Sequence, residues 1–240
     1  MSSESKSESE SIPTPTPQIL PRTSSHHAAV TLTQSLLPTP LTTYYLNSPK
    51  TRTPAGRQAD TPQPRIPSLT PTQKALTTSI YKSLTKAHTV SGLVLTAGPH
   101  HAAVALWLPP GSWTWKARLK SRMWMLWLRL GNEGRARVFG SWYLLEEGMR
   151  KVMGFRAEET WVLTGLGTKE RYRGKGFGRG VVEGGLRLAD EQREPVYLQC
   201  FEENVAFFER FGFVRKGTVS LDRALEPVVL QCMVREPRKG

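Results

Sequence analysis

A short glycine-rich segment, residues 173–178 with the sequence RGKGFG, separates a run with strand character from a run with helical character. The run before it, Trp161–Thr168, is apolar and β-rich, and the helical pattern after it reaches about Gln192. Glycines let the backbone turn tightly and leave its amides open to a ligand, because no Cβ stands in the way. The first amides of a helix have no partner within it and lie at the positive end of its dipole. The segment therefore predicts a site for a pyrophosphate.

Basic side chains surround this segment, and Glu170 is the single acidic residue among them. The 240-residue chain is itself basic, with a formal net charge of +13 and a pI of about 10.1. Such a balance indicates an anionic partner: nucleic acid, anionic lipid or a phosphate-bearing cofactor. A ligand with several phosphates suits the local field, which is formed by Lys169, Arg171, Arg173, Lys175 and Arg179.

Other interpretations of the segment fit less well. A dinucleotide fingerprint needs Gly-x-Gly-x-x-Gly, whereas the glycines here follow Gly-x-Gly-x-Gly and come late in the chain. A Walker A motif needs Gly-Lys followed by Ser or Thr, and Lys175 is followed by Gly176. A third interpretation is a flexible turn with solvated charges, but the strand and helix on either side favour an ordered loop.

The chain as a whole predicts one domain behind a polar tail. Residues 1–24 are rich in Ser, Glu, Thr and Pro, so they cannot bury enough apolar surface to offset the entropy of ordering, and we expect them to be disordered. A domain over 25–236 follows, with a Pro-rich insertion at about 48–71. Its pattern predicts an α/β or α+β domain with a central mixed sheet. We expect helices at about 25–36, 72–88, 112–130, 138–152, 178–192 and 205–211, and strands at 90–96, 102–108, 161–168, 196–200, 214–218 and 228–234.

The two cysteines, Cys200 and Cys232, form neither a disulfide framework nor the spacing of a zinc site. A reducing compartment and no metal are therefore expected. The Ser- and Glu-rich start lacks the basic and apolar regions of a secretory signal, and no run reaches the ~18 apolar residues of a membrane span. We expect a cytoplasmic or nuclear protein without a membrane span, either a monomer or a homodimer.

Residues 173–178 match the acyl-CoA loop of the GNAT superfamily of N-acetyltransferases, whose pattern is Gln/Arg-x-x-Gly-x-Gly/Ala between a strand and a helix. The segment 195–198 (PVYL) resembles the next strand of that fold, and 204–213 (NVAFFERFGF) resembles its Asn…Tyr-Glu-x-x-Gly-Phe segment. Three further segments, 103–110, 161–163 and, more weakly, 27–46, resemble the branch that contains puromycin N-acetyltransferase. The resemblance implies the GNAT fold, a central, mixed, mostly antiparallel, twisted sheet flanked by helices, in which strands four and five splay apart.

The resemblance also implies an activity, the transfer of an acetyl group from acetyl-CoA to the amine of a small acceptor. The acyl-pantetheine arm would lie between the splayed strands, facing Leu166, Gly167 and Thr168, and Asn204 would lie near the far arm of the cofactor. An amine would attack the thioester directly, with strand-four amides polarising its carbonyl oxygen. The pyrophosphate would be bound by Arg173, Gly174, Lys175, Gly176, Phe177, Gly178 and Arg179.

Two positions depart from the family pattern. The family has Tyr at the position of Phe208, as a proton donor to the leaving thiolate, and a phenyl ring cannot donate a proton. Water or another side chain would replace it, the thiolate would leave unprotonated, or the chain would be a CoA-binding protein with weak or lost catalysis. Gln199 stands where the branch often has Glu, which removes one residue that could steer or deprotonate the amine.

A general base is not evident in the sequence. The amine must be neutral to attack, so a carboxylate or imidazole near strands four and five would help. Glu147 is the candidate base, although acidic helix residues such as Glu146, Glu147, Glu158 and Glu159 are more often solvated. The turn residues His100 and His101 are expected to be exposed. Cys200 is expected to be a buried strand residue rather than a nucleophile.

For the acceptor we expect Trp107, Trp124 and Gln199 to line the site. The tryptophan-rich run 112–130 would form core and cleft wall, or its interleaved basic residues would place it on a membrane or partner. Binding to nucleic acid is a rival interpretation of the basic charge, but no recognition helix or RNA-binding motif accompanies that charge.

Overall fold

The computed structural model describes residues 16–21, 24–37, 39–46, 70–112, 123–223 and 227–238. The expectations for residues 1–15, for most of the Pro-rich insertion and for Trp113 and Trp115 lie outside these ranges. A seven-stranded sheet forms the centre of the described part, in the order β1-β2-β3-β4-β5-β7-β6. The strands are β1 (Gln18–Ile19), β2 (Leu93–Ala97), β3 (Ala103–Leu108), β4 (Trp161–Thr168), β5 (Val196–Cys200), β6 (Val214–Leu221) and β7 (Val228–Arg235).

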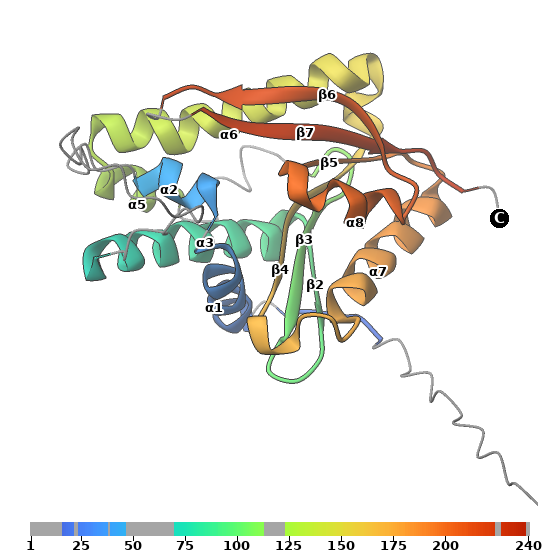
Figure 1. Cartoon of the computed structure of the whole chain (residues 1–240), viewed down its shortest axis with the longest axis horizontal. Coiled ribbons are helices and arrows are strands. Elements are labelled where there is room, and N and C mark those ends of the chain that lie inside the picture. Colours follow the sequence, from blue (N-terminus) through green and yellow to red (C-terminus); the bar gives the residue numbers. More distant parts are fainter. Residues whose placement is uncertain are drawn as a thin grey trace, which may run out of the picture.

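Only the β4–β5 pair of this sheet is parallel, and its other neighbouring strands are antiparallel. The predicted mixed, mostly antiparallel sheet is therefore confirmed. Helices cover both faces: α7 packs on β2, β3 and β4 from one side, and α1 and α3 pack from the other (Figure 1). The α-helices are α1 (Ser25–Leu36), α2 (Pro40–Leu46), α3 (Pro71–Ser91), α5 (Met123–Arg129), α6 (Asn132–Met153), α7 (Phe177–Gln192) and α8 (Val205–Glu209), and short 3₁₀ turns lie at Gly154–Glu159, Glu170–Tyr172 and Glu202–Asn204.

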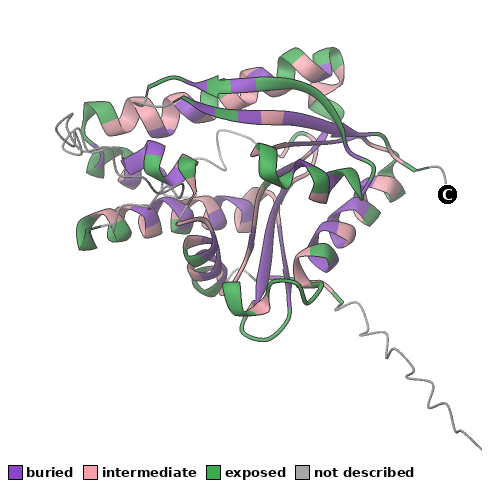
Figure 2. Cartoon of the chain, in the orientation of Figure 1, coloured by how far each residue is buried: buried purple, intermediate pink, exposed green. Residues whose placement is uncertain are grey.

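Alternation along β3 divides the core between the two faces of the sheet. Ala105 and Trp107 pack on the α7 side, whereas Val104 and Leu106 pack on the side of α1 and α3. Because both faces are covered, β2 and β3 are buried along nearly their whole length, as Figure 2 shows. None of the described helices is both long enough and apolar enough to span a membrane.

The long helix α3 begins where its sequence closes a capping box. The Gln73 amide donates to the Thr70 hydroxyl at 3.3 Å, and the Thr70 amide donates to Gln73 Oε1 at 2.9 Å. Pro71 follows at the first helical position, which needs no amide hydrogen. The helix continues to Ser91, so Val90 and Ser91, which we expected to open a strand, are helical instead.

The expected disorder of residues 1–24 is wrong for the described part of that stretch. Gln18 and Ile19 pair with Thr96 and Leu95 of β2, and the Leu20 amide donates to Val94 O at 2.8 Å. Leu20 is buried against the core beneath α1 and α3. Backbone pairing with the edge of the sheet and the burial of Leu20 order this stretch, and composition alone does not reveal such an edge.

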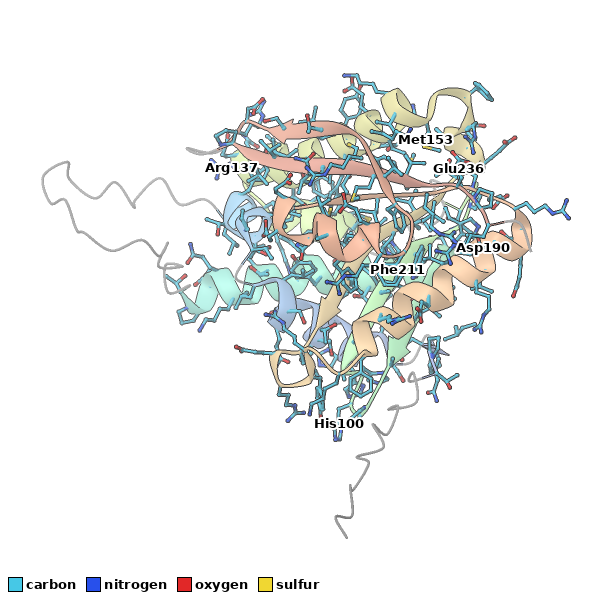
Figure 3. The ribbon with its side chains drawn as sticks, turned by 45° about the vertical axis from the view of Figure 1, so that its right-hand side comes forward. His100, Arg137, Met153, Asp190, Phe211 and Glu236 are labelled. Carbon is cyan, nitrogen blue, oxygen red and sulfur yellow. The ribbon has the colours of Figure 1, made fainter. Side chains whose placement is uncertain are left out.

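A buried ion pair joins the end of α7 to β7. The Arg235 side chain, 3% exposed, donates to Asp190 Oδ1 at 2.8 Å and Oδ2 at 2.7 Å, and its Nε donates to Phe211 O at 2.9 Å. Figure 3 shows Asp190 and Phe211 on neighbouring elements. Burial alone would raise the pKa of Asp190, but the hydrogen bonds from Arg235 and from the Arg238 amide outweigh it, so the pKa lies below its ordinary value.

We expect Asp190→Asn to lower the free energy of unfolding at pH 7 by about 3 kcal/mol, because it leaves a buried guanidinium without its counter-charge. Since the folded-state pKa is lowered, this stabilisation is complete above the unfolded pKa of about 3.9 and is lost as the pH falls through the folded value. Urea unfolding at pH 7 and near pH 3 measures both effects. Glu191→Gln on the same helix is the control, and an equal loss in that variant would contradict a specific role for the pair.

Candidate active site

Strands β4 and β5 pair over three residues and then part. The pairs are Trp161 with Val196, Val162 with Tyr197 and Leu163 with Leu198. Both strands continue beyond this point, and Figure 1 shows them diverging. The expected splay of strands four and five is therefore present. A strand that has lost one neighbour exposes backbone donors and acceptors on that side, which an extended ligand can use.

A β-bulge lies where the strands part. Leu106 of β3 pairs with Gly165 and Trp107 pairs with Leu163, so Thr164 is an extra residue in β4. The insertion breaks the alternation, and Thr164 and Gly165 both face α1 and α3. In agreement with this, a Cβ on Gly165 would lie 3.4 Å from Cδ1 of Leu106, which packs on that side.

A cavity of about 2030 Å³ runs along this cleft. At one end lies the loop before α7, the central part follows β4, and the other end lies among α3, α5 and α6. Ordinary small-molecule pockets measure roughly 300–1,000 Å³, so this space can hold a large cofactor together with an acceptor. Among the predicted cofactor residues, the wall includes Leu166, Gly167, Thr168, Arg173, Gly174, Gly176, Phe177, Gly178, Arg179 and Asn204.

The loop before α7 has the backbone conformation that its glycines predict. Gly174 and Gly176 have φ angles of 75° and 81°, in the left-handed region that favours glycine. The Arg173 amide donates to Glu170 O at 3.0 Å, and the Gly180 amide donates to Gly176 O at 2.9 Å. Between them, the amides from Gly174 to Arg179 have no hydrogen-bond acceptor among the described residues.

Gly178 is a second feature that lets the loop accommodate a bulky anion. A Cβ at this position would lie 2.9 Å from Thr168 Oγ1, so any other residue would press the start of α7 away from the end of β4. The loop thus presents open amides at a helix N-terminus with little side-chain cover. The residues present fit a diphosphate group.

Of the five basic residues around the loop, two line the cavity and the other three, Lys169, Arg171 and Lys175, do not. Arg173 and Arg179 line the wall, and Arg179 also pairs with Glu183 at 2.7 Å.

The Lys169 ammonium donates to His100 O at 2.7 Å and so joins the loop to the β2–β3 turn. Burial, and then the nearby Arg171, lower the pKa of Lys169. Lys175 is outside the wall, with its ammonium 5.6 Å from the ring centroid of Tyr172.

The far end of the cavity is apolar and aromatic. Trp124 and Trp127 of α5 are about half exposed, at 52% and 46%, and both line the wall. The Arg135 guanidinium lies 3.6 Å from the centroid of the Trp127 ring. Because Trp124 is half exposed and lines the wall, an acceptor could contact it. The same end is lined by Leu36, Leu41, Tyr45, Tyr81, Leu84, Met123, Phe139, Trp142 and Tyr143.

The expectation that Trp107 contacts the acceptor is wrong. Its side chain is fully buried on the α7 side of β3, edge-on to Trp161 at 6.4 Å between ring centroids. Gly185 of α7 leaves the space that the ring fills, since a Cβ there would lie 2.1 Å from Trp107. Because β3 is apolar on both faces, its sequence does not show which face Trp107 takes.

Glu147 does not line the cavity either, and its carboxylate pairs with Lys151 at 2.8 Å. Glu146, the next residue back, does line it and pairs with Arg150 at 2.8 Å. Glu158 is the other acidic residue of this end. His100 lies away from the cavity, at the tip of the β2–β3 turn (Figure 3).

Phe208 and Gln199 both line the cavity. Phe208 is buried, edge-on to Phe207 and Phe213, and offers no hydroxyl to the cleft.

Gln199 Nε2 donates to Leu145 O at 2.9 Å and to the Tyr197 hydroxyl at 2.7 Å. That hydroxyl donates to Cys232 Sγ at 3.0 Å, and burial raises the pKa of Tyr197. Gln199 is thereby held in place.

His88, which we did not expect in the site, is 1% exposed near the end of α3 and lines the cavity. Its Nδ1 lies 2.8 Å from Leu84 O, and its Nε2 lies 2.7 Å from Thr164 Oγ1. Burial lowers the pKa of His88 to about 4, so the ring is neutral at pH 7. The sequence does indicate that His88 faces the core, because position 88 continues the four-residue spacing of Leu76, Ile80 and Leu84.

The splayed sheet, the open loop at α7 and the cavity that joins them define the architecture of an N-acyltransferase. Residues 97–213 match the model of the Acetyltransferase (GNAT) family. A Schizosaccharomyces pombe protein described as an uncharacterized N-acetyltransferase is 33% identical over 168 residues, which are 68% of each chain. The chain belongs to the GNAT acetyltransferase family.

Solved structures share the fold at low sequence identity. A Corynebacterium glutamicum protein described as histone acetyltransferase HPA2 and related acetyltransferase matches with a TM-score of 0.60 and 18% identity, over 95% of this chain and 98% of that one. A mosquito arylalkylamine N-acetyltransferase like 5b matches with a TM-score of 0.58 and 13% identity, over 92% of this chain and 98% of that one. These likenesses support the fold.

Neither cysteine is expected to react quickly in the folded protein. Cys200 and Cys232 are both buried, and burial raises the pKa of the Cys200 thiol to about 12. The thiolate is the reactive form, so a thiol reagent at pH 8 should modify no cysteine rapidly in native protein and two after unfolding in guanidinium. Rapid modification of one thiol in native protein would contradict the placement of Cys200 in the core.

Proposed function

We propose that this chain transfers the acetyl group of acetyl-CoA to the amine of a small acceptor by direct attack. The observation that carries the proposal is the continuous cavity, which passes from open amides at α7, through the gap between β4 and β5, to an aromatic end. Acetyl-CoA would supply the thioester whose carbonyl carbon the amine attacks. No covalent enzyme intermediate is needed. Cys200 is part of the cavity wall, but it is buried and burial raises the pKa of its thiol, so little reactive thiolate forms.

Each part of the cavity would have its own task. The amides of 174–179, helped by Arg173 and Arg179, would hold the pyrophosphate. The β4 backbone along Leu166–Thr168 would bind the pantetheine arm, and donors there would stabilise the negative charge that develops on the carbonyl oxygen. Asn204 would contact the far arm from the start of α8.

The leaving group can depart without a strong proton donor, although a donor would speed its departure. A thiol has a pKa of about 8.5 to 9, so its anion leaves more readily than an alkoxide would. Phe208 occupies the position of the family's tyrosine and would pack against the arm without donating a proton. The reaction is therefore proposed to proceed without a side-chain acid at this position.

The acceptor is proposed to be an amine with an apolar or aromatic body. Trp124, Trp127 and Trp142 offer rings that can stack on such a body. The carboxylates of Glu146 and Glu158 lie at the same end and can attract an ammonium group before it loses its proton. The fold relative from mosquito is named for arylalkylamines, which agrees with this proposal.

Gly176→Asp tests the cofactor site, because its carboxylate would lie among the amides proposed to bind the pyrophosphate. Calorimetry with CoA should show affinity lowered by about 100-fold, because the negative carboxylate would lie beside the negative pyrophosphate in a confined site. Gly176→Asn is the matched control, with nearly the same shape and no charge, and Asn tolerates the left-handed φ of this position.

Equal losses in the Asp and Asn variants would mean that backbone strain, and not the charge, is responsible. Unchanged CoA affinity in Gly176→Asp would overturn the proposed site.

Phe208→Tyr tests the missing proton donor. The new hydroxyl would enter the cleft at the family's usual position, and we expect kcat with acetyl-CoA to rise about tenfold, below the 100-fold or more that general acids can contribute when the leaving group is poor. Steady-state kinetics at pH 7 measures the change. Unchanged kcat with unchanged thermal stability would show that thiolate protonation does not limit the rate.

A further inference from the structure

His88 and Thr164 form a hydrogen-bonded pair. The groups around the pair determine which of its atoms carry hydrogens. Leu84 O can only accept, so Nδ1 of His88 carries a hydrogen and donates it at 2.8 Å. The neutral ring then has no hydrogen on Nε2, so Nε2 must accept, and the Thr164 hydroxyl donates to it at 2.7 Å. Leu106 O lies farther from the same hydroxyl, at 3.2 Å. The hydroxyl hydrogen therefore points at His88.

The oxygen of Thr164 has a lone pair left for the cavity. Thr164 is exposed and belongs to the cavity wall, although its partner His88 is 1% exposed. With its hydrogen directed into the protein, the hydroxyl can act toward the cavity only as a hydrogen-bond acceptor. A hydroxyl in water would rotate freely and act as either donor or acceptor.

Thr164 is also placed where the two halves of the cavity meet. It is the first β4 residue after Leu163, the last residue that pairs with β5. The bulge turns it toward α3, on the side where the cavity continues to the aromatic end. A group held at Thr164 would lie between the proposed pantetheine path and the proposed acceptor pocket.

We propose that Thr164 Oγ1 accepts a hydrogen bond from the N–H of the attacking amine, and that His88 is a positioning residue that fixes the hydroxyl for this task. The inference rests on the proposed function. A neutral primary amine has two N–H groups and one lone pair. One N–H bonded to Thr164 leaves the lone pair free to turn toward the thioester carbon.

The pair orients the amine and does not remove its proton. Burial holds the pKa of His88 at about 4, so an imidazolium formed by relay through Thr164 would be unstable at pH 7. The proton that the amine nitrogen loses as the new amide forms therefore passes to water in the open cavity. The thiolate of CoA leaves with the electron pair of the C–S bond.

Thr164→Val and Thr164→Ser test the hydroxyl, with acetyl-CoA and two amines of different kind, 2-phenylethylamine and agmatine. Valine keeps the shape and removes the oxygen, so kcat/KM for an accepted amine should fall about tenfold, the value of one hydrogen bond. Serine restores the oxygen and should keep kcat/KM within about twofold. CoA affinity by calorimetry should stay within about twofold in both variants.

His88→Leu separates positioning from a merely structural role. Alone it should lower kcat/KM about fivefold, because Thr164 then rotates freely. In the Thr164→Val background it should lower kcat/KM no further, since a positioning residue has no effect once its target is gone. Thr85→Val is the matched control, because that buried hydroxyl of α3 bonds Tyr81 O and lies outside the cavity wall.

Three results would overturn the inference: full kcat/KM in Thr164→Val, failure of Thr164→Ser to restore it, or effects of His88→Leu and Thr164→Val that simply multiply. Each requires thermal melting well above the assay temperature. If the wild-type chain acetylates neither amine, the proposed function and this inference fail together. If it acetylates one and Thr164→Val is unaffected, only this inference fails.

Discussion

The site depends on the limited pairing between β4 and β5. Their parallel ladder covers three residues and stops at Leu163 and Leu198, although both strands continue. If the pairing continued along β4, the two strands would close over the backbone groups proposed to bind the pantetheine arm. The bulge at Thr164 lies where the ladder stops, so the same irregularity also sets which β4 side chains face the proposed acceptor pocket.

The predictions that succeeded rest on local chemistry. Strands 161–168 and 196–200 lie where they were expected, because apolar β-rich runs bounded by turn residues are a strong short-range signal. The loop before α7 was predicted from glycines that the backbone needs at positive φ, as Gly174 and Gly176 show. These features could be predicted because each depends on residues close together in the chain.

The predictions that failed depend on contacts between distant residues. Trp107 is buried because Gly185, far along the chain, leaves room for its ring. Glu147 is the exception, because its partner Lys151 is local, one helical turn away, and the pair holds the carboxylate outside the cavity wall. The His88–Thr164 pair joins residues 76 positions apart, and no local pattern couples a helix end to a bulge. Family membership does not supply these side-chain contacts either, since each depends on this chain's own residues.

In the proposed function, CoA binds along β4 and against the open amides before α7. Hydrogen–deuterium exchange with and without saturating CoA tests it without any substitution, because amides that gain a ligand exchange more slowly. The proposed binding predicts slower exchange in peptides covering 164–180 and unchanged exchange in α6 and β6. Unchanged exchange over 164–180, with slowing elsewhere or nowhere, would contradict it.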